Sequence, residues 1–163
     1  CLDLLVDRLL QTVEKAAQET GGKVHLIGHS LGGILSRSVA TSEPECIASV
    51  ATLGSPYRGV RSHPTVLKIA ELVRARIHRD RPNGGPPDCY TGFCHCEAVD
   101  ALASPFPTCV REAAIYTKSD GIVDWRSCIN DDPHTDFEVT GTHVGLAFNS
   151  SVYSILARHL ANR

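Results

Sequence analysis

Hydrophobic positions along the chain change repeatedly between helical and strand-like spacing. Residues 2–19 carry apolar side chains at i, i+3, i+4 and i+7, which predicts an amphipathic helix that ends at Gly21-Gly22. The apolar positions of this stripe are Leu2, Leu5, Val6, Leu9, Leu10, Val13, Ala16 and Ala17. A short apolar run over residues 23–28 predicts a buried strand, and residues 30–41 return to helical spacing. The chain is therefore predicted to open as helix, strand, helix.

The same alternation continues to the end of the sequence. Further strands are predicted at residues 46–53, 112–117 and 136–140, and further helices at residues 64–79, 97–103 and 151–160. Asn149 or Ser150 is the expected N-cap of the last helix. Strands that alternate with helices predict an α/β fold with a mostly parallel sheet, in one domain over residues 1–163. Because four strands make a small sheet and the chain opens uncapped inside a helix, we expect further sequence with a strand or two before residue 1.

One glycine-rich turn lies where a predicted strand meets a predicted helix. Its sequence, Gly28-His29-Ser30-Leu31-Gly32, has the pattern G-x-S-x-G. A nucleophilic serine on such a turn needs small neighbours, so we expect that side chains at Gly28 and Gly32 would collide with the adjoining strand and helix. The N–H of Leu31, at the start of a helix, is placed to donate to an oxyanion. A glycine-rich helix start without chemistry is the alternative, and the strand–turn–helix context favours the nucleophile.

A serine nucleophile needs a base, and the base needs an acid that orients it. In a parallel sheet these groups lie at the carboxyl ends of the strands. Asp120 directly follows the strand at residues 112–117, with Asp124 as the second candidate, and His143 follows the strand at residues 136–140. The chain order Ser, Asp, His is the one expected for a serine on a strand-to-helix elbow.

The loop at residues 55–60 follows the second strand and belongs to the same edge of the sheet. Tyr57 on this loop has two equal interpretations, as a residue that lines a substrate site or as ordinary loop packing.

Four segments together carry a resemblance to a known family. "GHSLGG", "TLGSPYRG", "YTKSDGIVDW" and "GTHVGL" resemble, in order and spacing, the bacterial lipases and serine esterases of the α/β-hydrolase fold. The resemblance is weakest over residues 60–110. It implies an α/β-hydrolase fold that lacks N-terminal strands, with Ser30 as nucleophile, Asp120 as orienting acid and His143 as base. The family also draws a second oxyanion donor from a His-Gly-type loop, which has no counterpart in this sequence.

The resemblance implies a serine carboxylic-ester hydrolase that forms an acyl-enzyme on a small-molecule or lipid ester. The implied mechanism needs no cofactor, and the sequence has no match to the calcium site of lipases, so no metal site is expected. The alternatives are an acyltransferase or thioesterase with the same triad, and an inactive hydrolase-like binding fragment. Residues 60–110 fall where this fold often carries a cap, which we expect to be fixed and to favour short or medium acyl chains.

Composition adds two constraints. The 163 residues are 42% hydrophobic with a net charge of −2, so neither nucleic acid nor an anionic membrane is indicated as a partner. No apolar run approaches the ~20 residues of a membrane-spanning helix.

Seven cysteines are many for this length. Five of them lie close together, at Cys89, Cys94, Cys96, Cys109 and Cys128. A metal site that includes His95 is one interpretation, but the spacing is not that of paired C-x-x-C ligands. We favour a disulfide-stapled loop, and hence an extracellular or periplasmic protein, with a cytoplasmic location as the alternative.

Overall fold

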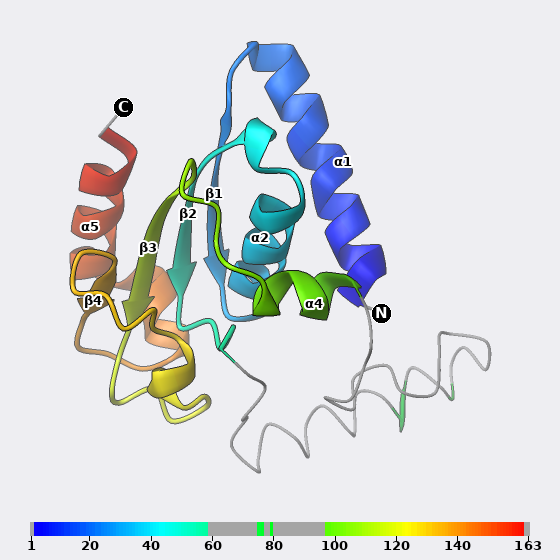
Figure 1. Ribbon diagram of the computed structural model, residues 1–163. Helices are drawn as coiled ribbons and strands as arrows, with labels where there is room; N and C mark the ends of the chain where they lie inside the picture. The colour runs from blue at the N-terminus through cyan, green and yellow to red at the C-terminus, as the bar shows by residue number, and fades with distance from the viewer. Residues whose placement is uncertain (1, 59–74, 77–78, 80–96, 162–163) are drawn as a thin grey trace.

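A single parallel sheet organises the structure, a computed structural model that describes residues 2–58, 75–76, 79 and 97–161 (Figure 1). Its four strands are hydrogen-bonded in the order β1-β2-β3-β4, and every neighbouring pair is parallel. The strands are β1 (Val24–His29), β2 (Ile47–Leu53), β3 (Arg111–Tyr116) and β4 (Asp136–Glu138). The predicted α/β class and parallel sheet are therefore confirmed.

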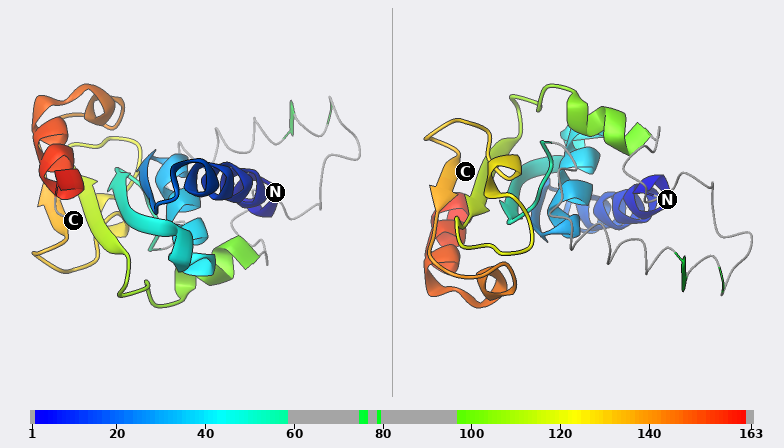
Figure 2. Two further views of the ribbon diagram at one scale, coloured as in Figure 1. Left: turned by 90° about the horizontal axis from the view of Figure 1, so that it is seen from above. Right: turned by 90° about the horizontal axis from the view of Figure 1, so that it is seen from below.

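Helices cover both faces of this sheet. They are α1 (Leu2–Thr20), α2 (Leu31–Ser42), α4 (Glu97–Ala103) and α5 (Ser150–Ala161), with short 3₁₀ turns η1 (Pro44–Cys46), η2 (Trp125–Ser127) and η3 (Val144–Phe148). Helices α1, α2 and α4 lie together on one side and α5 lies on the other (Figure 2). Two apolar cores result: Val50 of β2 packs with α1, α2 and α4, while Ala51 and Leu53 of the same strand pack with α5.

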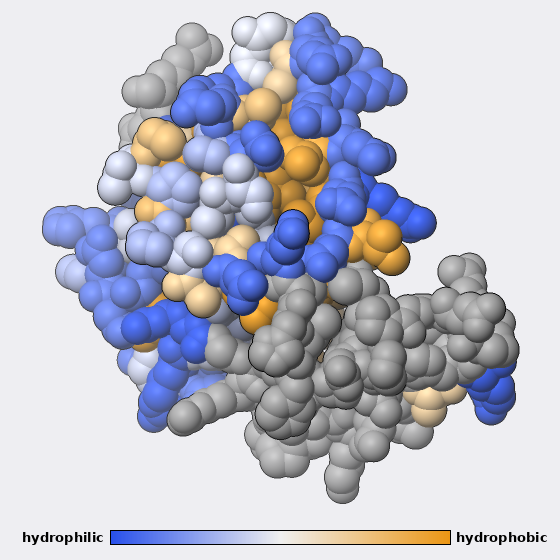
Figure 3. Space-filling view, turned by 45° about the vertical axis from the view of Figure 1, so that its right-hand side comes forward, coloured by the Kyte–Doolittle hydropathy of each residue, from blue (hydrophilic) through white to orange (hydrophobic). Residues whose placement is uncertain are grey.

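The amphipathic pattern of the first helix is confirmed. Val6 and Val13 of α1 are buried, and polar residues cover its outer surface with an apolar band beside them (Figure 3). The helix ends where predicted, because Gly21 adopts a positive φ of 66° and its N–H donates to the carbonyl of Ala17 at 2.9 Å. A left-handed glycine of this kind is a common helix terminator.

The first two strands differ in how much of each is buried. β2 is almost wholly buried between its two neighbours, as predicted. β1 was expected to be buried too, but His25 and Ile27 are exposed, Ile27 at 49%. The reason is that Leu26 faces the helices on one side of the sheet, whereas on the other side the core around α5 is built on β2 and β3.

The predicted elements after β2 differ in how far the structure bears them out. β4 is shorter than the predicted 136–140 because Gly141, with a φ of 148°, begins a turn. The helix at 64–79 and most of the cap at 60–110 lie outside the described residues; α4 matches its predicted bounds. No described helix combines the length and hydropathy of a membrane span.

The structure describes three of the cysteines, two of which belong to the predicted disulfide-stapled loop. Cys46, Cys109 and Cys128 are free thiols, so the described residues give no support to a disulfide through Cys109 or Cys128. Cys128 is 1% exposed, its thiol lies 3.8 Å from the carbonyl of Asp124, and burial raises its pKa to about 12. Cys89, Cys94, His95 and Cys96 lie outside the described residues. A staple or a metal site among those four stays a prediction, as does the location outside the cytoplasm.

Iodoacetamide at pH 8 should distinguish a buried thiol from a stapled cysteine. The reactive species is the thiolate, and burial with a raised pKa keeps Cys128 a thiol, so we expect no alkylation of Cys128 in the folded protein. Exposed Cys109 is the internal control and should be alkylated. Peptide mass mapping in urea should then find both modified. A Cys128-linked peptide in an unreduced digest would contradict the buried-thiol description.

Candidate active site

Ser30 lies on a strained turn between β1 and α2. Its φ of 53° and ψ of −119° are unusual for a residue with a side chain and cost about 1–3 kcal/mol. Backbone hydrogen bonds hold the turn on both sides: the N–H of Ser30 donates to the carbonyl of Leu53 at 2.9 Å, and the carbonyl of Ser30 accepts from the N–H of Gly33 at 3.1 Å. Backbone strain of this size, held in place by hydrogen bonds on both sides, is a feature of functional sites.

The glycines around Ser30 have different roles from those predicted. A Cβ on Gly28 would lie 2.4 Å from the backbone of Gly32 and Gly33, so Gly28 is sterically required. Nothing lies within 4 Å of a Cβ placed on Gly32, and the expectation of a collision there is wrong. The second tight position is Gly33, where a Cβ would lie 2.0 Å from the hydroxyl of Ser55. The helix turns Gly32 outward and Gly33 toward the end of β2, which a linear motif does not reveal.

Asp120 and His143 form a buried hydrogen-bonded pair. Nδ1 of His143 lies 2.7 Å from Oδ2 of Asp120, and the two residues are 4% and 5% exposed. The other carboxylate oxygen, Oδ1, accepts from the N–H groups of Ile122 at 3.0 Å and Val123 at 2.8 Å. Because a carboxylate accepts, Nδ1 of His143 carries the proton and Nε2 is left as the acceptor of the neutral ring.

Gly54 links this pair to the elbow. It follows β2 directly with a φ of 54°, and a Cβ there would lie 3.2 Å from both Oδ2 of Asp120 and Nδ1 of His143. The preceding residue, Leu53, accepts the hydrogen bond from Ser30. The end of β2 therefore has the serine turn on one side and the Asp–His pair on the other.

Two residues of this site were missed from the sequence. Gly54 carried a usable signal, since a glycine directly after a buried strand marks a close approach of other groups. His29 occupies a variable position of the G-x-S-x-G pattern, but its Nε2 lies 2.9 Å from the carbonyl oxygen of His143. That contact spans 114 residues of sequence, so no local pattern indicates it.

Asp124 is engaged elsewhere. It is the N-cap of η2, where its carboxylate accepts from the N–H of Arg126 at 3.0 Å, and its side chain is 45% exposed. The neighbouring Trp125 stacks on Tyr116 of β3 with ring centroids 5.5 Å apart. The structure thus brings Asp120, and not Asp124, to His143.

Tyr57 lies buried in a polar cluster. Its hydroxyl donates to Asn130 at 2.8 Å, and the guanidinium of Arg37 stands 3.9 Å from its ring. Arg37, on α2, also pairs with Glu112 of β3 and lies 4.5 Å from the ring of Phe106. Burial raises the pKa of Tyr57 and lowers that of Arg37. These contacts describe packing that anchors α2; a role for Tyr57 in substrate binding stays a prediction.

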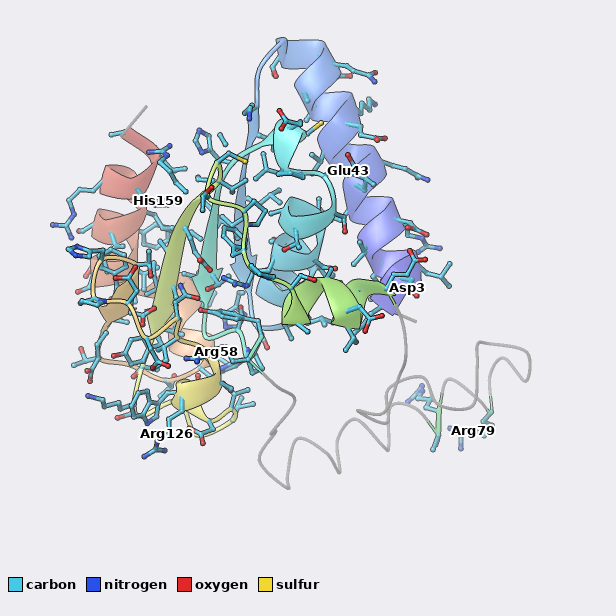
Figure 4. The ribbon with its side chains drawn as sticks, in the orientation of Figure 1. Asp3, Glu43, Arg58, Arg79, Arg126 and His159 are labelled. Carbon is cyan, nitrogen blue, oxygen red and sulfur yellow. The ribbon has the colours of Figure 1, made fainter. Side chains whose placement is uncertain are left out.

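A polar cavity of about 620 Å³ lies near the same end of the sheet. Arg58, after β2, and Arg126, in η2, contribute to its lining (Figure 4), and Arg58 pairs with Asp131, which also lines it. Cations and carboxylates are balanced in this lining, so its charge does not select an anionic or a cationic ligand.

Comparison with known proteins identifies relatives in sequence. A family model described as palmitoyl protein thioesterase matches residues 3–106. Triacylglycerol lipases from Pseudarthrobacter phenanthrenivorans and Burkholderia plantarii are each 50% identical to this chain over 54 residues, which is 32% of the chain. Those residues are 17% and 15% of the two relatives, so this chain spans a small part of their length.

Solved structures show the fold. A serine hydrolase from Cycloclasticus zankles aligns with a TM-score of 0.61 at 12% identity, over 97% of this chain and 72% of its own. A Bacillus licheniformis lipase aligns with a TM-score of 0.57 at 16% identity, over 93% and 71%. The chain has the α/β-hydrolase fold, and the resemblance to lipases and esterases drawn from the sequence is confirmed.

Replacement of Gly54 by alanine should distort the Asp120–His143 bond. The new methyl group would stand 3.2 Å from both bonded atoms and 2.9 Å from the side chain of Leu146, so all three groups must shift. The Nδ1 proton of His143, far downfield in an NMR spectrum when bonded to a buried carboxylate, should shift or vanish in this variant. Gly21→Ala is the matched control, because Gly21 has a similar positive φ and nothing within 4 Å of its Cβ position. Both variants should melt a few degrees lower, but an unchanged proton signal in Gly54→Ala would refute the steric argument.

Proposed function

This chain belongs to the palmitoyl protein thioesterase family, and from that premise we propose that it is a serine hydrolase of carboxylic esters that acts through Ser30, His143 and Asp120. The observation that carries the proposal is the buried 2.7 Å bond between Asp120 and His143, beside a serine on a strained strand-to-helix turn. Such a bond fixes the tautomer of the base and stabilises the imidazolium that forms during acyl transfer.

The reaction follows from these groups. Nε2 of His143 takes the hydroxyl proton of Ser30 as Oγ attacks the ester carbonyl, and the carbonyl π electrons move to the oxygen. The oxyanion accepts from the N–H of Leu31, the first residue of α2, whose amide has no partner within the helix. Collapse expels the alcohol, which takes the proton from His143, and leaves an acyl-enzyme. Water then repeats the cycle and releases the acid. Every proton moves among Ser30, His143, alcohol and water, so the proposal invokes no cofactor.

An apolar acyl group is the proposed substrate moiety. Three exposed hydrophobic side chains stand next to or near the triad in sequence: Leu31 after Ser30, Ile122 after Asp120 and Val144 after His143, exposed at 44%, 38% and 60%. Apolar groups in water favour contact with an apolar ligand. The lipase relatives support the same choice. A preference for short or medium chains rests on the cap at 60–110 and stays a prediction.

Thioester hydrolysis is the second candidate, and the family model over residues 3–106 favours it. An acyltransferase would share the acyl-enzyme and differ in the acceptor. A catalytically inactive binding protein is the remaining alternative, against which the complete bonding of Asp120 and His143 argues.

Ser30→Ala should abolish hydrolysis by the full-length protein. Loss of a triad nucleophile costs roughly 10⁶ in turnover, because no other group can form the acyl-enzyme. The assay compares p-nitrophenyl butyrate with an acyl-CoA thioester, and Ser42→Ala at the other end of α2 is the matched control. Near-wild-type turnover in Ser30→Ala would reject the nucleophile. Thioester turnover with no ester turnover in the wild type would select the second candidate.

Asp120→Asn should be far more damaging than Asp124→Asn. The amide at position 120 would offer His143 the wrong partner for its tautomer, a change that typically lowers kcat by about 10⁴. Asp124 caps a 3₁₀ turn and should affect kcat less than threefold. Steady-state kinetics on the same ester measures both. Equal losses would remove the distinction that the structure draws between the two carboxylates.

A further inference from the structure

We propose that His29 is a positioning residue that fixes the catalytic base, by donating a hydrogen bond from Nε2 to the backbone carbonyl of His143. The proposal rests on the proposed function, since it assigns His29 a task in the same reaction. His29 is the last residue of β1 and the covalent neighbour of Ser30. The bond would therefore tie the backbone of the nucleophile directly to the backbone of the base.

The geometry of the contact is specific. Nε2 of His29 lies 2.9 Å from the carbonyl oxygen of His143, within the normal range of an N–H···O bond. The two imidazole rings are 4.8 Å apart between centroids and tilted by 49°. Because a carbonyl oxygen can accept but not donate, Nε2 of His29 must carry a hydrogen. His29 therefore serves as a donor, whether its ring is neutral or protonated.

His143 is held at three atoms. Its Nδ1 and its backbone N–H both bond to Asp120, at 2.7 Å and 3.3 Å, and its carbonyl oxygen bonds to His29. The two bonds to Asp120 fix His143 relative to the loop after β3. The bond to His29 fixes it relative to the serine turn. Rotation about the Asp120 anchor is therefore opposed from the side of the nucleophile.

The position of His143 in the chain explains why such an anchor matters. Gly141, two residues before it, has a φ of 148° that favours glycine, and Val144, directly after it, is 60% exposed. The side chain that directly follows His143 thus contributes little packing to hold this turn. Misplacement of a reacting group by about 1 Å can cost on the order of 10²-fold in rate. A single hydrogen bond to the carbonyl of His143 can therefore control the rate without touching the substrate.

Side-chain replacements of graded reach test this assignment. Glutamine places an amide N–H about as far from the backbone as Nε2 of histidine, while asparagine is shorter and leucine has no donor. We expect His29→Leu and His29→Asn to lower kcat about 10- to 100-fold with KM changed less than threefold, by the loss of alignment. His29→Gln should recover to within about threefold of the wild type. His25→Leu is the matched control, because His25 lies on the same strand, bonds Ser49 and should leave kcat unchanged.

The outcomes separate this inference from the proposed function. Labelling of Ser30 by a fluorophosphonate is followed beside ester turnover, with melting temperatures of all variants. A wild type that neither labels nor turns over would reject the proposed function and the inference together. A wild type that labels, with His29→Leu equally fast, would overturn the inference alone. Equal losses in His29→Gln and His29→Leu would also overturn it, because they would assign His29 a packing role and not a donor role.

Discussion

Parallel register holds the carboxyl ends of the strands level, and the candidate site depends on this. His29 of β1 pairs with Leu53 of β2, Leu53 pairs with Ile115 of β3, and Tyr116 pairs with Glu138 of β4. Neighbouring strands lie about 4.8 Å apart, so loops that leave consecutive strand ends emerge side by side. Residues that are distant in sequence are thus brought together at one edge of the sheet by short loops. A slip of two residues between any pair would displace one member of the site by a full side-chain repeat.

A buried carboxylate then dictates the structure of that edge. Asp120 is 5% exposed, and a buried charge is tolerated when its oxygens are bonded. The N–H groups of Ile122 and Val123 satisfy one oxygen and His143 satisfies the other. The loops that carry the pair are joined again where the buried hydroxyl of Thr117 donates to the carbonyl of Gly141 at 3.0 Å.

A second buried polar group supports the site from behind. Arg37 on α2 pairs with Glu112 of β3 and lies between the rings of Tyr57 and Phe106. Breaking a buried ion pair by removal of one partner costs about 3–5 kcal/mol, since the other charge is left unpaired. Helix α2 begins at the serine turn, so its fixed position on β3 also fixes the turn.

Local patterns were sufficient to predict the described helices and strands, apart from the length of β4, and to select Ser30, Asp120 and His143 as candidates. Hydrophobic periodicity and turn residues are local properties of the sequence that define the elements. The rule that sites lie at the carboxyl ends of parallel strands then predicts where the site is. Contacts between side chains of distant segments cannot be predicted from any local stretch of sequence. The exposure of β1, the roles of Gly32 and Gly33, the burial of Cys128 and the bond from His29 all depend on such contacts.

The arrangement around His143 bears on the choice between ester and thioester. In the proposed mechanism, both reactions use His143 as a base when Ser30 attacks. They differ when the leaving group departs: a thiol has a pKa near 8.5 and leaves as a thiolate, whereas an alkoxide is far more basic and needs a proton in the transition state. An acid that is held at three atoms and stabilised as an imidazolium by a fully bonded Asp120 serves that second step. Ester hydrolysis uses both halves of the proton cycle of His143, and thioester hydrolysis depends chiefly on the first. The imidazolium that Asp120 stabilises forms in both reactions when Ser30 attacks, so the bonding around His143 is compatible with either substrate, and the ester makes the fuller use of it.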